Sequence, residues 1–354
     1  MKDKIITYSF ILFISLFGLF HIILKDQEIS STERRKLNTF PEIELTSEYI
    51  EKIDKYLLDH FPLRDTFRSV KALYNYKVLN QLDNNNIYLK DNYIFKSEYP
   101  TNKDSISFFI NKTNNIKNLL SEDNNVYMMI IPDKNYYLDS KDFLQIDYNY
   151  LYKELNKLDI NMIDIKDTLS LSDYYETDTH WKQERLDKVV KVLSTNMNFE
   201  YQEIKYKTNT YNKFYGVYYG ESAINRKPET ITYLTNDTIL NSKVKYLENP
   251  KLTTVYNKDN LNSFDSYEVY LDGATSFIEI TNPNSKSNKE LIIFRDSFGS
   301  SLSPLLIEYY DKITIIDNRY ISSIYFKDLI EFKDQDVLFI YSTLLVNKSF
   351  TLKG

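Results

Sequence analysis

The balance of apolar and polar residues changes sharply after the first two dozen positions. Residues 5–24 (IITYSFILFISLFGLFHIIL) carry no charge and are long enough to span a bilayer as one helix. Lys2 and Lys4 precede this segment, and their positive charge predicts that residues 1–4 form a cytoplasmic tail. A cleaved signal peptide is the alternative, but it would have a shorter apolar region and a small-residue cleavage site. We therefore favour an uncleaved anchor followed by an extracytoplasmic chain.

The apolar pattern of residues 25–100 predicts small, mainly helical elements. Residues 46–59 and 63–79 each place apolar side chains at helical spacing, and Pro62 separates the two. Two short apolar runs within 87–95 flank Lys90-Asp91-Asn92 and predict a β-hairpin. Residues 25–100 are accordingly predicted to form a stalk, a helical pair and a hairpin.

From residue 101 onward, short apolar runs alternate with amphipathic segments. This rhythm predicts an α/β domain at 101–354, with a parallel sheet covered on both faces and functional loops at the carboxyl ends of its strands. Residues 201–277 break the rhythm and predict an insertion that shapes one side of a cleft. The predicted strands are 126–131, 161–165, 290–294, 312–316 and 336–341, and the predicted helices are 105–120, 148–158, 182–197, 299–310 and 322–329.

The amino-acid composition excludes several kinds of active site and partner. The absence of cysteine excludes thiol nucleophiles, thiolate metal sites and disulfides. A net charge of -6 without a basic stripe argues against a nucleic-acid partner. The 32 tyrosines suit either a sugar-stacking surface or a general compositional bias, and the abundance of Asn, Lys and Ile favours the bias.

Two short blocks supply the parts of a serine-nucleophile site. Ser297, in the block Arg-Asp-Ser-Phe-Gly, follows an apolar strand and precedes a helical segment, so it is expected at the rim of the sheet beside unpaired helix N–H groups. His180, in the block Asp-Thr-His-Trp, is the candidate base that activates the hydroxyl. Asp178 lies two residues earlier and can orient the imidazole.

Each block also has a structural interpretation. Ser297 could cap its helix, and Asp178 and His180 could be turn and packing residues. A metal is the main competitor for Asp178 and His180, but a zinc site needs at least three ligands. Of the other histidines, His21 falls in the apolar segment and His60 is expected to make a structural hydrogen bond. We therefore predict neither a metal nor a cofactor.

Several phrases, taken in order, carry a family resemblance. They are ERRKL at 33–37, DHFPLRD at 59–65, IPDK at 131–134, and the two blocks around His180 and Ser297. Between residues 33 and about 345 the chain resembles the DHHW family and, beyond it, the SGNH-hydrolase-like acetyltransferase domains of alginate O-acetylation proteins. The family name leads one to expect histidine at position 179, where this chain has Thr179.

The resemblance implies a three-layer α/β/α SGNH-hydrolase-like sandwich in permuted order, with the serine block after the Asp–His block. It assigns Ser297 as nucleophile, His180 as base and Asp178 as its orienting acid. The Ser297 N–H is the expected first oxyanion donor, and Asn318 and Arg319, which follow the strand ending at 316, are candidates for others.

Lys134 follows a predicted strand end and is expected on the same rim. There it would either help to position substrate or be a solvated loop residue.

The expected function is that of a membrane-anchored, extracytoplasmic serine-dependent acyl ester enzyme. An O-acetyltransferase and an acetylesterase, each acting on cell-surface polysaccharide, share the same acyl-enzyme chemistry. Transfer would need acetyl groups from across the membrane, so the resemblance implies a multi-pass membrane partner that supplies the acyl donor. The alternative from another class is a non-catalytic glycan-binding or scaffold protein of the cell envelope.

Overall fold

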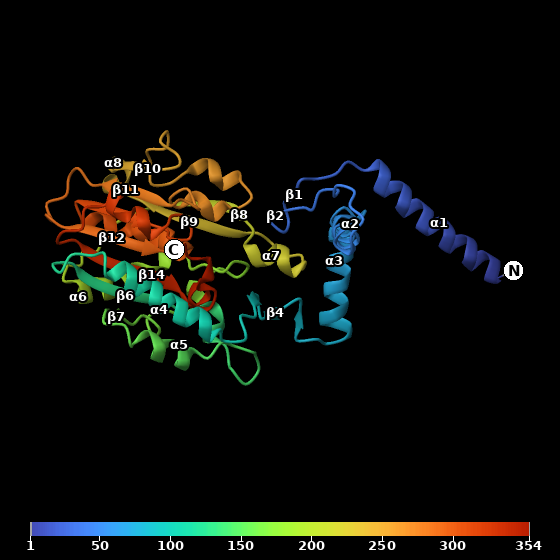
Figure 1. The fold of residues 1–354 in the computed structure, drawn as a ribbon, viewed down its shortest axis with the longest axis horizontal. Coiled ribbons are helices and arrows are strands. Elements are labelled where there is room, and N and C mark those ends of the chain that lie inside the picture. Colours follow the sequence, from blue (N-terminus) through green and yellow to red (C-terminus); the bar gives the residue numbers. More distant parts are fainter. Residues whose placement is uncertain (1, 354) are drawn as a thin grey trace. The chain divides into compact units, whose positions relative to one another are not determined.

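The computed structural model describes residues 2–353 and divides them into two compact units. The smaller unit contains the residues up to 88 together with 217–227, and the larger contains 89–216 with 228 onward. Figure 1 traces both along the chain. The domain boundaries predicted from the sequence, at residue 100 and around 201–277, stay predictions.

The smaller unit begins with helix α1 (Lys2–Ile23), none of whose described residues is buried. Among residues 2–353 it is the one helix long and apolar enough to cross a membrane, and N-terminal signal sequences share these properties. Its role as an anchor stays a prediction. The unit's other elements are β1 (Ile29–Ser30), β2 (Arg35–Lys36), α2 (Ser47–Asp59), α3 (Arg64–Leu73), the π-helical turn η1 (Tyr74–Val78), β3 (Asp83–Asn84) and α7 (Val217–Ser222).

The predicted helical pair and hairpin are both present. Helix α2 ends before Pro62 and α3 begins after it, because proline cannot supply the N–H that a continuing helix needs. The hairpin pairs β4 (Ile87–Lys90), where the two units divide, with β5 (Tyr93–Lys96).

The larger unit is built on a seven-stranded sheet in the order β10-β11-β13-β12-β14-β6-β7. The five strands from β13 to β7 run parallel, and β11 and β10 add to one edge antiparallel. The strand bounds are β6 (Asn125–Ile131), β7 (Asn161–Ile163), β10 (Lys243–Tyr246), β11 (Phe277–Thr281), β12 (Glu290–Arg295), β13 (Lys312–Ile316) and β14 (Asp336–Ser342).

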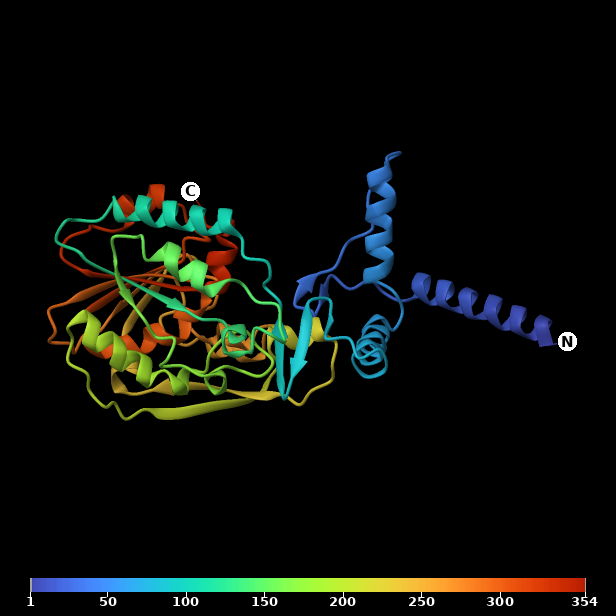
Figure 2. The same cartoon turned by 90° about the horizontal axis from the view of Figure 1, so that it is seen from below.

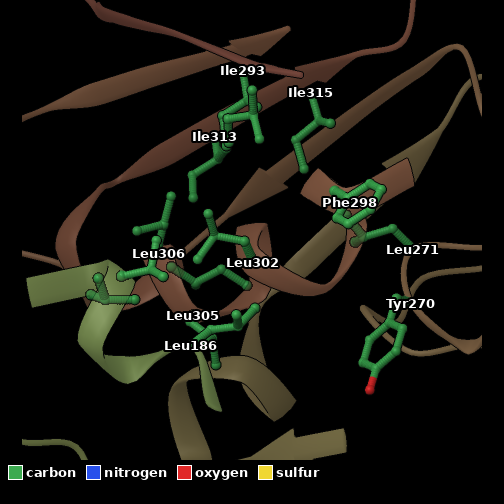
Figure 3. Packing of buried hydrophobic residues seen from close by; sticks show 14 of the residues in the cluster. Leu186, Tyr270, Leu271, Ile293, Phe298, Leu302, Leu305, Leu306, Ile313 and Ile315 are labelled. Atoms are coloured by element: carbon green, nitrogen blue, oxygen red, sulfur yellow. The ribbon is translucent and has the colours of Figure 1, made fainter. Parts of the chain in front are cut away.

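Both faces of the sheet are covered. Because successive side chains of a strand point to opposite faces, Leu291 and Ile293 pack into one core while Ile292 and Phe294 pack into the other. Figure 3 shows the first core, in which Ile293 lies above the leucines that follow β12. Figure 2 shows the sheet between α4 on one side and α6 on the other. The predicted α/β/α sandwich, with its serine block late in the chain, is therefore confirmed.

The layer around Leu291 contains α6 (Asp187–Met197), α9 (Ser297–Leu302) and the 3-10 helix η7 (Ser303–Tyr309). The opposite layer contains α4 (Lys103–Lys117), α5 (Tyr148–Leu155), α10 (Phe326–Leu329) and α11 (Thr343–Asn347). The remaining short helices are η2 (Lys134–Tyr137), η3 (Leu171–Asp173), η4 (Gln183–Arg185), α8 (Asp237–Asn241), η5 (Lys258–Asn262), η6 (Ser266–Val269), η8 (Ser323–Tyr325) and η9 (Ser349–Thr351).

Three predicted helices are partly 3-10 helix in the structure. The helix expected over 322–329 is η8 followed by α10. The helix expected from residue 182 begins as η4 and becomes regular only at Asp187. The helix expected over 299–310 is α9 followed by the 3-10 helix η7, which has Pro304 in its first turn. Proline lacks the N–H needed for an α-helical bond, which favours this break.

Residues 201–277, where helical and strand-like segments did not alternate regularly, form two kinds of structure. Strands β8 (Lys207–Phe214) and β9 (Glu229–Thr235) pair as a separate antiparallel ribbon. Strand β10 instead joins the central sheet beside β11, and η5 and η6 lie between these two strands in the chain. The segment thus extends the sheet and supplies contacts described below.

Candidate active site

The turn from β12 into α9 places Ser297 at the carboxyl edge of the sheet. Asp296 is the N-cap of α9, and its Oδ1 accepts from the Phe298 N–H at 3.0 Å. Its Oδ2 accepts from the Ser342 N–H and O–H groups at 2.8 and 2.6 Å, which ties the turn to the end of β14. Asp296 therefore fills the capping role, and the hydroxyl of Ser297 is left for other contacts.

Ser297, His180 and Asp178 are joined by consecutive hydrogen bonds. His180 Nε2 lies 2.7 Å from Ser297 Oγ, and His180 Nδ1 lies 2.6 Å from Asp178 Oδ1. The same Asp178 oxygen accepts from the His180 backbone N–H at 3.0 Å. Because ionised Asp178 can only accept, this arrangement places a proton on Nδ1 and leaves Nε2 to accept from the serine hydroxyl.

Solvent exposure increases along the three hydrogen-bonded residues from Asp178 to Ser297. Asp178 is 1% exposed and His180 is 7% exposed, whereas Ser297 is only partly buried. A substrate can therefore approach from the Ser297 end, while the carboxylate stays shielded from water. Shielding strengthens the attraction between Asp178 and an imidazolium.

A carboxylate from β9 holds the backbone just before Asp178. Glu229 accepts from the Glu176 and Thr177 N–H groups, both at 2.7 Å, and from the Thr177 hydroxyl at 2.5 Å. The Gly216 N–H donates to Thr177 Oγ1 at 2.9 Å. A Cβ atom at Gly216 would lie 2.4 Å from Asp178 Cα, so only glycine permits this close approach.

The residues after His180 fasten the same loop to α9. Trp181 Nε1 donates to the Phe298 carbonyl at 3.0 Å and lies 2.9 Å from Ser301 Oγ. Gln183 Nε2 donates to the Ser301 carbonyl at 2.7 Å. The two motif blocks are therefore held together by buried hydrogen bonds as well as by the His180–Ser297 contact.

Tyr267 forms a wall of the site that the sequence did not reveal. Its ring stacks on the His180 imidazole with a centroid distance of 3.8 Å and an interplanar angle of 7°. Its hydroxyl lies 2.8 Å from Ser301 Oγ, and burial raises the pKa of this phenol well above its usual value. The only sequence signal was the abundance of tyrosine, which could not single out one ring among 32.

The groups expected to hold an oxyanion lie at the same edge of the sheet. Within residues 2–353, the Ser297 N–H makes no hydrogen bond. Asn318 Oδ1 accepts from the Tyr341 hydroxyl at 2.8 Å, and the Arg319 guanidinium donates to both oxygens of Asp317 at 2.9 and 2.6 Å. These bonds give Asn318 and Arg319 structural partners, and their roles as oxyanion donors stay predictions.

Arg295 is a buried cation directly before the serine turn. Its Nη1 lies 3.4 Å from Asp317 Oδ2, and its Nη2 donates to the Gly273 carbonyl at 3.2 Å. A Cβ atom at Gly299 would come within 2.7 Å of Arg295 Cβ, so this glycine lets α9 lie close over the arginine. Arg295 and Gly299, which belong to the serine block, thus shape the turn from within.

Lys134 corrects an expectation. It is 3% exposed, and its Nζ donates to the carbonyls of Ile94, Tyr175 and Glu176 at 2.7, 3.1 and 3.3 Å. Burial lowers the pKa of this amine to about 7. These contacts hold Lys134 against the loop before Asp178, so it is not a solvated loop residue, and a role in positioning substrate stays a prediction.

The other two histidines belong to the smaller unit. His60 Nε2 lies 2.9 Å from the Asn38 carbonyl, which is the structural hydrogen bond expected for it. Among residues 2–353, no three His, Asp or Glu side chains come together in a group that could hold a metal ion.

Comparisons with known proteins agree with this fold. No family model matches the chain, and no curated protein matches it. A DHHW family protein from Eubacterium siraeum superimposes with a TM-score of 0.63 and 18% identity, covering 77% of this chain and 97% of that one. Bacillus cereus PatB1 gives 0.58 and 18% identity, covering 74% and 97%.

A further match is the O-acetyltransferase domain of Pseudomonas putida AlgJ, with a TM-score of 0.44 and 11% identity, covering 74% of this chain and 92% of that one. The structural neighbours include a protein of the DHHW family, which the sequence motifs resemble. This chain has the fold of the DHHW family protein and of PatB1.

Proposed function

We propose that this protein is a membrane-anchored, extracytoplasmic serine-dependent acyl ester enzyme, an O-acetyltransferase or acetylesterase that acts on cell-surface polysaccharide. The observation that carries the proposal is the hydrogen-bonded chain from Asp178 through His180 to Ser297 at the carboxyl end of β12. A serine hydroxyl becomes a useful nucleophile only when an adjacent base takes its proton, and His180 Nε2 lies in position to do so.

In the first half of the proposed reaction, Ser297 Oγ attacks the carbonyl carbon of an acetyl ester while its proton passes to His180 Nε2. Asp178 stabilises the resulting imidazolium through its bond to Nδ1. The Ser297 N–H is the proposed donor to the negative carbonyl oxygen. The tetrahedral intermediate then collapses, the alkoxide of the donor takes the proton from His180, and acetyl-Ser297 remains.

The second half runs the same steps with a new hydroxyl. His180 takes a proton from a sugar hydroxyl in a transferase, or from water in an esterase, and that oxygen attacks the acetyl carbonyl. Collapse releases the acetylated product or acetate and returns the proton to Ser297 Oγ. Transfer to a polysaccharide outside the cytoplasm would require a membrane partner that delivers acetyl groups.

The serine role can be tested with a sulfonyl fluoride, a choice supported by the PatB1 structure that carries a sulfonyl adduct. We expect one sulfonyl group per chain, because Ser297 Oγ bonds to sulfur as fluoride leaves and His180 takes the proton. Ser297→Ala should gain none, while Ser300→Ala, a buried neighbour on α9, should label as the native chain does. The measurement is intact mass, with p-nitrophenyl acetate turnover alongside.

Two outcomes would contradict the proposal. One is labelling of Ser297→Ala equal to that of the native chain. The other is a native chain that neither labels nor turns over the ester above background, which would favour a non-catalytic glycan-binding protein. Partition of labelled acetyl between water and added polysaccharide fragments then separates esterase from transferase.

A further inference from the structure

The helices of the smaller unit carry an apolar face that is largely exposed. Side chains spaced by three or four residues share one side of α3 and η1, as expected for an amphipathic helix. Leu58, in the last turn of α2, is apolar and exposed as well. The exposed residues of this face are Leu58, Leu63, Phe67, Val70, Tyr74 and Val78.

The opposite side of α3 is fastened to the rest of the unit. Arg64 Nη2 lies 2.7 Å from Glu33 Oε2, and Arg68 Nη2 lies 3.1 Å from Glu33 Oε1. Ala72, on the same side as these arginines, is fully buried. Because the polar side is anchored inward, the apolar side of α3 is directed outward.

Aromatic contacts place this face beside the apolar helix α1. Phe17 stacks on Phe61 with a centroid distance of 5.4 Å and an interplanar angle of 15°, and it lies 6.0 Å from Phe67. Phe17 precedes Leu24, the end of the apolar segment, by seven residues. At 1.5 Å per residue this puts Phe17 about 10 Å inside that segment. Helices that lie in a membrane interface bury their apolar face by about 5–10 Å, which is the same depth.

We propose that the apolar face of α2, α3 and η1 is embedded in the outer leaflet of the membrane that α1 crosses, so that its partner is lipid. This inference rests on the anchoring role proposed for α1. Acidic and basic side chains alternate along the pair, as in Glu51–Lys55 and Asp65–Arg68. Apolar burial therefore drives the binding, and anionic lipid is not required.

The absence of cysteine makes this directly measurable. Val70→Cys or Val78→Cys introduces a single thiol for an environment-sensitive fluorophore in the full chain, reconstituted in phosphatidylcholine vesicles. Quenching by a nitroxide on the lipid chain is compared with quenching by aqueous iodide. Leu240→Cys is the matched control, because Leu240 of the larger unit is 63% exposed and Val70 is 58% exposed.

We expect the labels at 70 and 78 to emit at shorter wavelength and to be quenched by the lipid nitroxide more than by iodide, with the reverse order at 240. Stronger iodide quenching at 70 and 78 would put the face in water and overturn the inference. Protection from both quenchers would mean that protein, from the same chain or from a second copy, covers the face, and it would also overturn the inference.

Membrane insertion of α1 and ester turnover are measured separately in the same vesicles. A label from Leu16→Cys in α1 that escapes the lipid nitroxide would remove the anchor and this inference together. Ester turnover that depends on Ser297 reports the proposed chemistry whatever the labels show.

Discussion

Asp178→Asn tests whether the buried carboxylate stabilises a charged His180. The substitution keeps the size of the side chain and an oxygen that can accept from His180 Nδ1, but it removes the negative charge. In the structure, Asp178 Oδ1 accepts from both the ring and the backbone of His180, so the amide can preserve the loop. A loss of activity would then report the missing charge and not a changed fold.

The magnitude follows from the distance and the burial. With 2.6 Å between Oδ1 and Nδ1, the centres of the two charges lie roughly 4 Å apart. At an effective dielectric constant of about 20, a pair at that separation attracts by about 4 kcal/mol. Each 1.36 kcal/mol is a factor of ten in rate, and the amide dipole recovers part of the loss. We expect kcat/KM for ester turnover to fall about 100-fold to 1,000-fold.

The assay is turnover of p-nitrophenyl acetate, with the rate of sulfonyl labelling as a second measure of Ser297 reactivity. Both rates should fall together, because both steps transfer the Ser297 proton to His180. Asp164→Asn is a matched control, since this carboxylate is largely exposed and pairs with Lys166. It should leave both rates and the apparent Tm near native values.

A fall of less than about fivefold for Asp178→Asn, at an unchanged Tm, would refute the charge argument, because it corresponds to only about 1 kcal/mol. His180 would then act without electrostatic help from this carboxylate. A large fall in Tm would instead show that Asp178 is needed to hold its loop.

Two further predictions concern residues packed around the proposed triad. Tyr267→Leu removes the ring stacked on His180 and should lower kcat/KM roughly tenfold, since a desolvated cation–π contact is worth about 1–2 kcal/mol. Tyr267→Phe keeps the ring and should stay near the native rate. Equal losses of kcat/KM in both variants would contradict a role for the ring. Burial lowers the pKa of Lys134 to about 7. Between about pH 7 and 10 the unfolded chain therefore binds a proton at this lysine that the folded chain lacks. The free energy of unfolding then rises with pH by up to about 1.4 kcal/mol per pH unit. The apparent Tm of the native chain should therefore gain on that of Lys134→Met from pH 7 to pH 9, and parallel Tm curves for the two would show that this lysine does not titrate there.

The strands could be predicted because the central positions of a parallel sheet are apolar on both faces. The runs at 126–131, 290–294 and 336–341 needed no alternation to be recognised, and all three lie inside the sheet. Helix starts were harder. The pattern predicted a helix from residue 182, yet Trp181 and Gln183 both bond to α9, and these tertiary bonds delay the regular helix to Asp187.

The candidate triad could be found because histidine is rare here, so one Asp-x-His sequence carried weight. Lys134 shows the limit of that reasoning. A lysine after a strand normally reaches solvent, and only the three-dimensional path of the chain brings the Ile94, Tyr175 and Glu176 carbonyls around its amine. Burial of this kind depends on contacts between distant segments, which residue spacing does not encode.

The hydrophobic pattern predicted least about the structure of residues 201–277, yet this segment supplies much of the support for the site. Glu229 fixes the backbone before Asp178, Gly216 lets the chain pass against it, and Tyr267 covers the face of His180. None of these contacts is local in sequence, so each forms only when the segment has packed onto the rest of the larger unit. The geometry of Asp178 and His180 therefore depends on this packing, and a side chain at position 216 should disturb the triad even though Gly216 has no chemistry of its own.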